Sequence, residues 1–192
     1  MRSILRHDPD VVLVGEIRDS LTAEIAVKLS NTGHITLSTL HTNDAPSTIS
    51  RLYKMGIEPF LLAQVINIII AQRLIRKLCP SCKIPLPKEK YHIALEFGLS
   101  EEDLISSKIY DHGPGCKKCI KGYKGRTTIA EALYFTPEIR RVVFNCSTEI
   151  NEEKIKEVAK SQGMHNLKDS GILRIKEGIT SIEEIIYATS AE

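Results

Sequence analysis

The sequence of 192 residues predicts an α/β protein whose core sheet is at least partly parallel. A strand, a helix, a second strand and a second helix follow one another with short connections over residues 11–56. Two Cys-x-x-Cys pairs then bracket residues 79–119, and helix-capping residues recur from residue 136 onward. The sequence therefore predicts an α/β core, an inserted cysteine module and a helical C-terminal region.

The first half of the predicted core consists of one strand and one helix. Residues 11–14 (VVLV) are a short, mostly β-branched run, which is typical of a strand buried on both faces of a parallel sheet. Asp19 or Ser20 can cap the helix that follows, and Gly33 can end it.

The second half of the core repeats this order. Residues 34–39 alternate in polarity as a second strand does. Pro46 suits the first turn of the next helix, and Gly56 lies just past its end. A long apolar helix is then predicted over residues 59–78, because Pro59 can open it and the first Cys-Pro step breaks it.

The rest of the chain alternates between extended and helical segments. Residues 83–90 contain two prolines and predict an extended linker, residues 91–107 predict one or two short helices, and residues 127–131 predict a returning strand. The remaining helices are expected to start near Thr136, Asn151 and Ser181, with one more that ends at Gly178. Ser181 and Glu184 have the spacing of a capping box.

The composition is that of an ordinary globular protein, with 42% hydrophobic and 26% charged residues. This balance excludes a wholly disordered or fibrous chain. The net charge of +2 is too small to indicate binding to nucleic acid or anionic membrane by itself. The longest apolar stretch, residues 60–71, contains two polar residues and is shorter than the ~20 residues of a membrane span. Residues 1–8 lack the apolar run of a signal peptide.

The cysteines predict a metal site. Cys79 and Cys82 form one pair and Cys116 and Cys119 another, with 33 residues between the pairs. Two such knuckles can bring four thiolates to one Zn²⁺ at ~2.3 Å. The alternative is a redox-active Cys-x-x-Cys motif, but that motif follows a strand and opens a helix, and neither pair is predicted to do so. Cys146 is left over and is expected to be a small buried hydrophobic residue.

Polar side chains follow both predicted strands, at the sheet edge where α/β proteins bind ligands. Glu16 comes after the first strand and could orient a water molecule or a magnesium ion. His41 comes after the second strand and could donate a hydrogen bond to a γ-phosphate. Position alone leaves alternatives open, because Glu16 could be an ion-pair partner of Arg18, and both His34 and His41 could be structural.

The chain resembles the secretion ATPase superfamily in two long segments, residues 8–19 (DPDVVLVGEIRD) and residues 32–44 (TGHITLSTLHTND). The members of this family are the hexameric motors of type II secretion and type IV pilus assembly. The first segment resembles the family's Walker B region and the second its histidine box. Further matches are residues 72–82, 116–119, 122–126, 169 and 178–184. The four cysteines indicate the secretion and pilus-extension branch, since retraction motors of the family typically lack them.

The resemblance implies the C-terminal portion of a RecA-like nucleotide-hydrolase core with an inserted Cys₄ zinc module and a C-terminal helical region. Residues 1–78 would be the second part of the core, residues 79–126 the zinc module, and residues 127–192 the returning strand with a helical subdomain. The full-length motor would use ATP and Mg²⁺ and would act as a hexamer. It would be cytoplasmic and would associate with the inner membrane through a platform protein and other secretion or pilus components.

The resemblance also implies roles for individual residues. Glu16 would place the attacking or magnesium-bound water, His41 would contact the γ-phosphate, and His34 would be the second histidine of the box. These three residues are the predicted catalytic set.

Four further residues are predicted near the nucleotide. Gly15 stands where many nucleotide hydrolases have a magnesium-coordinating Asp, so metal coordination would depend on groups outside this sequence. Arg18 would brace the strand end, and Arg2 and Arg6 resemble family arginines near the nucleotide or the subunit boundary. The phosphate-binding motif G-x-x-x-x-G-K-[ST] is absent from the sequence, so the chain alone is predicted not to hydrolyse ATP.

The two cysteine pairs lie in basic surroundings. Six cations face one acid over residues 72–90, and five cations and no acid lie between residues 116 and 126. A zinc-ribbon module for nucleic acid would have such a surface. The preferred interpretation is that these cations compensate the two negative charges of a Zn²⁺–thiolate site and dock to an acidic partner surface. Nucleic acid is less favoured, because only Tyr123 is available for base stacking. Nucleic acid is therefore not predicted as a partner. The alternatives left open are a zinc-ribbon module that binds nucleic acid and a non-catalytic interaction scaffold.

Overall fold

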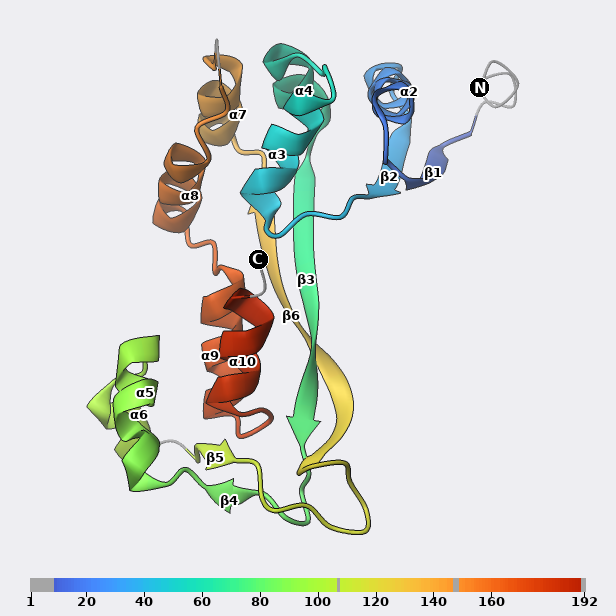
Figure 1. Cartoon of the computed structure of the whole chain (residues 1–192). Coiled ribbons are helices and arrows are strands. Elements are labelled where there is room, and N and C mark those ends of the chain that lie inside the picture. Colours follow the sequence, from blue (N-terminus) through green and yellow to red (C-terminus); the bar gives the residue numbers. More distant parts are fainter. Residues whose placement is uncertain (1–8, 107, 147–148, 191–192) are drawn as a thin grey trace. The chain divides into compact units, whose positions relative to one another are not determined.

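The computed structural model describes residues 9–106, 108–146 and 149–190 (Figure 1). The chain divides into two compact units. The first comprises Met1–Ala71 and Ala132–Met164, and the second comprises Gln72–Glu131 and His165–Glu192. The domain boundaries expected after residues 78 and 126 stay a prediction.

The first unit is a mixed α/β structure. Its elements are β1 (Val11–Glu16), α2 (Ser20–Asn31), β2 (Ile35–Thr39), α3 (Ala45–Lys54), α4 (Pro59–Val65), α7 (Pro137–Phe144) and α8 (Glu152–Ser161). The strands β1 and β2 pair in parallel, with Val12 opposite Thr36 and Leu13 opposite Leu37. The parallel pairing predicted from the strand–helix–strand order is thus confirmed.

Side-chain caps start the helices of this unit, and those at Asp19 and Thr136 are at predicted residues. The carboxylate of Asp19 accepts a hydrogen bond from the backbone N–H of Thr22 at 2.8 Å and caps α2. Asp44 caps α3 through a capping box with Ser47, and Pro46 lies in the first turn. Thr136 accepts from the backbone N–H of Ile139 at the start of α7.

One face of the β1–β2 pair is buried and the other is open. On the inner side Val12 is buried and Val14 packs against the core of the first unit, whose fully buried residues include Ile49, Leu62, Leu133, Ile139 and Ile155. The side chains on the opposite face are more than half exposed, and they are Val11, Leu13, Ile35 and Leu37. We call these four residues the open face.

The second unit consists of short strands and helices around its own core. Its elements are β4 (Ile84–Pro85), η1 (Lys88–Lys90), α5 (Tyr91–Phe97), α6 (Glu101–Ser106), β5 (Tyr110–Asp111), α9 (Leu167–Lys176) and α10 (Ile182–Ser190). The strands β4 and β5 pair antiparallel, and α10 packs against α9 and α5. The fully buried core residues include Ile75, Ile129, Ile175 and Ile185.

The prediction of one long helix over residues 59–78 is wrong. Helix α4 ends at Val65, and Ile68–Leu78 forms the strand β3, which pairs with β6 (Tyr123–Tyr134). The segment begins with three β-branched residues, Ile68–Ile70, which favour a strand once a partner strand supplies the backbone hydrogen bonds. The returning strand predicted over residues 127–131 exists and is longer than expected.

Among the described residues, we find no helix with the length and apolar character needed to cross a membrane.

Candidate functional site

The structure brings Glu16 and His41 together at the carboxyl edge of the parallel pair. Nε2 of His41 lies 2.8 Å from Oε1 of Glu16. The second carboxylate oxygen of Glu16 lies 2.7 Å from Nη2 of Arg18. The Glu16 side chain is 24% exposed, whereas that of His41 is 81% exposed. The carboxylate is therefore held on both oxygens while the imidazole remains open to solvent.

A bulge in β1 decides which way Glu16 points. The register shifts between Val14 and Glu16, so Glu16 rather than Gly15 pairs with Thr39. Thr39 also donates its hydroxyl to the carbonyl of Gly15 at 2.9 Å, which fixes the bulge. Paired residues of a parallel sheet share a face, and Thr39 continues the exposed row of β2. Glu16 thus lies at the end of the open face.

The loop that carries His41 is tied to α3. Arg51 on α3 donates a hydrogen bond from Nη1 to the carbonyl of His41. The hydroxyls of Thr42 and Thr48 lie 2.8 Å apart, and Asp44 caps the helix. Sequence reasoning missed Arg51. The available signal was its position two helical turns after the cap residue Asp44, which places it on the same side of α3.

Gly15 and Arg18 lie beside Glu16 at this edge, whereas His34 does not. His34 precedes β2 and so lies at the opposite end of this strand from His41. Its Nδ1 is 2.9 Å from the hydroxyl of Thr32 and 3.2 Å from the carbonyl of Leu29, which ties it to the end of α2. Arg2 and Arg6 lie outside the described residues.

The four paired cysteines form one cluster in the second unit. Their sulfur atoms all lie within 4.8 Å of one another, and none forms a disulfide. The Sγ atoms of Cys79 and Cys116 are 3.8 Å apart, those of Cys82 and Cys119 3.7 Å, and those of Cys116 and Cys119 3.6 Å. A tetrahedron with metal–sulfur bonds of ~2.3 Å has sulfur–sulfur edges of about 3.8 Å. The donor set therefore fits a tetrahedral thiolate-preferring ion such as Zn²⁺ in type, number and spacing.

Tight backbone turns place these sulfurs. The backbone N–H of Cys82 donates to the carbonyl of Cys79 at 3.3 Å, and that of Cys119 to the carbonyl of Cys116 at 3.2 Å. At Gly113 a Cβ atom would lie 1.7 Å from the carbonyl oxygen of Cys82, so only glycine fits there. A hydrogen bond from the backbone of Ser81, together with those from the three neighbouring thiols, lowers the pKa of the Cys79 thiol to about 7.

Cys146 takes no part in this cluster. Its thiol donates to the carbonyl of Val142 at 3.2 Å. The side chain is partly buried and packs against the core of the first unit, in keeping with the expected small hydrophobic role.

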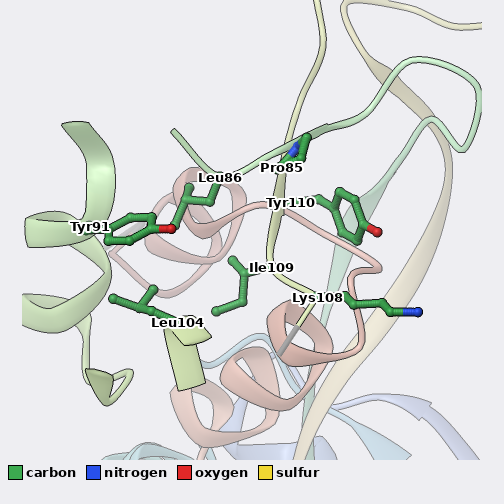
Figure 2. A pocket seen from close by; sticks show the side chains of 7 residues that line it. All are labelled: Pro85, Leu86, Tyr91, Leu104, Lys108, Ile109 and Tyr110. Atoms are coloured by element: carbon green, nitrogen blue, oxygen red, sulfur yellow. The ribbon is translucent and has the colours of Figure 1, made fainter. Parts of the chain in front are cut away.

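A pocket of about 240 Å³ lies in the second unit, between the α5–α6 helices and the β4–β5 strands (Figure 2). Its lining consists of Pro85, Leu86, Tyr91, Leu104, Lys108, Ile109 and Tyr110. Lys108 is the single charged residue in this lining, and the lining holds no thiol, carboxylate or imidazole. None of the predicted site residues belongs to it, so it offers no catalytic or metal-binding set.

Comparison with known proteins gives a family match along nearly the whole chain. The sequence model of the family "Type II/IV secretion system protein" matches residues 1–187. The chain is 46% identical to the type IV pilus assembly ATPase PilB of Pseudomonas aeruginosa, over 98% of this chain and 32% of that protein. It is 44% identical to the PilB of Acinetobacter baylyi, over 99% and 32%, and 44% identical to the type II secretion system ATPase E of Vibrio cholerae, over 98% and 36%.

The fold has solved counterparts at low sequence identity. The ATPase DotB of Yersinia pseudotuberculosis matches with a TM-score of 0.68 and 18% identity, over 100% of this chain and 39% of that chain. This match confirms the predicted RecA-like α/β fold class. The chain spans about a third of the length of the relatives it matches.

Proposed function

Because the chain belongs to the type II/IV secretion system protein family, we propose that it is the C-terminal part of the ATPase domain of a hexameric motor. The motor hydrolyses ATP to drive type II protein secretion or type IV pilus assembly. Relatives with both kinds of name are 44–46% identical to the chain, so the sequence relationship supports the motor class and not one of the two systems.

The contact between Glu16 and His41 is the observation that carries this proposal. The two side chains meet at 2.8 Å at the sheet edge where RecA-like ATPases bind nucleotide. In the proposed mechanism Glu16 orients the attacking or magnesium-bound water, and His41 donates a hydrogen bond to the γ-phosphate. Arg18 contacts one carboxylate oxygen and orients the Glu16 side chain.

The remaining groups of the nucleotide site would come from other parts of the protein. The sequence holds no phosphate-binding loop, and Gly15 supplies no carboxylate for magnesium. The open face supports this view, because four aliphatic side chains beside Glu16 stay uncovered in the described part of the chain. We therefore expect the isolated chain to show no ATP turnover. Roles for Arg2 and Arg6 near the nucleotide remain part of the proposal, and so does a catalytic role for His34, although His34 lies at the opposite end of β2 from His41.

The zinc site is proposed to be structural. Four thiolates fill a tetrahedral coordination sphere and leave no position for a reactive water. The metal would hold the two cysteine turns, and with them the start of β6, at the end of β3.

We further propose that the motor works on the cytoplasmic side of the inner membrane. The names of the relatives place them in pilus assembly and in secretion, and such work requires contact with a membrane-embedded platform protein. The hexamer is proposed from the family resemblance.

The experiment is ATP hydrolysis by a full-length motor that carries this sequence, measured as phosphate release. Glu16→Gln should lower kcat by about 100-fold or more while leaving the oligomer intact, because the neutral amide cannot activate water. Glu24→Gln is the matched control, since Glu24 is an acid on α2 whose ion pair with Lys28 is exposed. Turnover by Glu16→Gln close to that of the wild-type motor would refute the proposed role.

A further inference from the structure

The second cysteine turn ends in an exposed apolar residue surrounded by cations. We call residues 117–126 the knuckle tip. Ile120 is 81% exposed, although it lies between Cys119 of the metal cluster and the buried strand residue Tyr123. Single exposed aliphatic residues are ordinary on protein surfaces, so Ile120 is distinguished by its setting, next to a tight turn and among cations.

The tip is rigid. The backbone N–H and carbonyl groups of Ile120 and Tyr123 exchange two hydrogen bonds, at 3.0 and 2.9 Å, around a two-residue turn. Both turn residues are left-handed, Lys121 with φ 48° and Gly122 with φ 82°. A lysine rarely adopts this conformation, in which glycine or asparagine would be unstrained. Position 121 is therefore a lysine although its backbone conformation favours glycine or asparagine.

The base of the tip is fixed to the second unit. The guanidinium of Arg76 lies 4.2 Å from the ring centroid of Tyr123, whose hydroxyl is 2.7 Å from that of Ser181. The ring is thus buried and covered by a cation, which leaves it unavailable for stacking on a base. These contacts fix the tip before any partner binds, with Ile120 next to the two turn residues.

Cations dominate the surface of the tip. Five of its residues are exposed and basic, namely Lys117, Lys118, Lys121, Lys124 and Arg126. In the described ranges, none of these five side chains forms an ion pair. A Zn²⁺ ion with four thiolates carries two negative charges, which offset only part of this positive charge.

We propose that the knuckle tip docks into an acidic protein surface that has an apolar socket for Ile120. This inference rests on the proposed function, because it describes the surface with which a partner protein of the motor would bind. A rigid turn reduces the entropy lost on binding a shaped socket, and a fluid bilayer has no shape for it to match. Nucleic acid is disfavoured because the tip exposes no aromatic ring for stacking.

The experiment measures binding of two labelled acidic peptides to the zinc-loaded chain by fluorescence anisotropy, without nucleotide. Both peptides contain the same Glu and Asp residues, and one has an apolar Leu-Leu-Phe centre where the other has three Ser. We expect the apolar-centred peptide to bind at least tenfold more tightly. Ile120→Ser should abolish this difference and leave binding of the serine peptide unchanged.

Charge variants separate the two parts of the contact. Lys118→Glu with Lys121→Glu should weaken both peptides at least tenfold, and Lys160→Glu, an exposed lysine on α8, should change neither by more than twofold. Lys121→Asn suits the left-handed turn, so it should keep zinc and fold while weakening both peptides about threefold. Zinc content and melting temperature are recorded for every variant.

Any other pattern overturns the inference. Equal affinity for the two peptides excludes the socket. Tighter binding to phosphatidylglycerol vesicles or to single-stranded DNA than to the apolar-centred peptide assigns the tip to a membrane or a nucleic acid instead. Because no nucleotide is present, failure here leaves the ATPase proposal standing, and an unaffected Glu16→Gln motor leaves the docking inference standing.

Discussion

The cysteine cluster and the Glu16–His41 edge differ in how much of a site each contains. The cluster has four ligands of one kind within 4.8 Å, held by two local turns. The edge has one carboxylate and one imidazole at 2.8 Å, next to four uncovered aliphatic side chains. The comparison indicates that the cluster supplies all four ligands of a tetrahedral metal site. The edge supplies only part of a nucleotide site, in keeping with the proposal that other parts of the motor complete it.

The largest effect should come from removing one ligand of the complete site. Cys82→Ser is expected to reduce bound zinc from one ion per chain to none and to remove most of the hydrogen-exchange protection of the second unit. The reason is that structural zinc contributes on the order of 10 kcal/mol to the folding of small modules. Zinc content and exchange are the two measurements.

Cys146→Ser is the matched control for this substitution. It removes the one cysteine outside the cluster and should leave zinc content unchanged. Loss of exchange protection in the first unit of Cys82→Ser would contradict the local character of the site.

Two Leu→Ala substitutions test whether the open face is exposed to solvent. Leu62→Ala removes a fully buried side chain of the first unit and should cost about 2–5 kcal/mol. Leu37→Ala removes the same atoms from the open face and should cost less than about 1 kcal/mol. Exchange protection of α2 and α4 reports both values. Equal costs would mean that something within the chain covers Leu37.

A smaller effect concerns the support of the His41 loop. Burial raises the pKa of Asp44, but the stronger combined effect of the Ser47 hydrogen bonds and of Lys156 lowers it below its usual range. The carboxylate therefore contributes stability that is present above pH 4 and is lost as the pH falls through its folded-state pKa. Asp44→Ala should cost α3 about 1 kcal/mol of exchange protection at pH 7, and this cost should shrink as the pH falls below 4. A cost that stays the same over this fall in pH would show that the charge does not matter.

Local features of this fold could be predicted from the sequence. The caps at Asp19 and Thr136 and the spacing within each cysteine pair involve groups a few residues apart. The meeting of Glu16 and His41 was predictable because a parallel pair brings both strand ends to one edge.

Features that depend on distant partners could not be predicted. The sequence predicts a helix where strand β3 forms, because the apolar pattern of this segment suits a helix as well as a strand. The partner strand β6 lies far along the chain, so local sequence does not reveal the pairing. Ser181 caps α10 as predicted, accepting from the backbone N–H of Glu184 at 3.2 Å. The Glu184 carboxylate, which a capping box would direct back toward Ser181, instead bonds the backbone N–H and guanidinium of Arg76. The bulge that aims Glu16 and the contact of Arg51 with His41 likewise depend on tertiary context.

The most direct test of the proposed nucleotide site is a double-mutant cycle on kcat in a full-length motor that carries this sequence. If Glu16 and His41 act together on one water and one phosphate, Glu16→Gln and His41→Gln should each lower kcat about 100-fold or more. The double variant should then be no slower than the slower single variant. Effects that multiply would show that the two side chains act independently, and a His41→Gln motor with near wild-type turnover would show that the 2.8 Å contact has no part in hydrolysis.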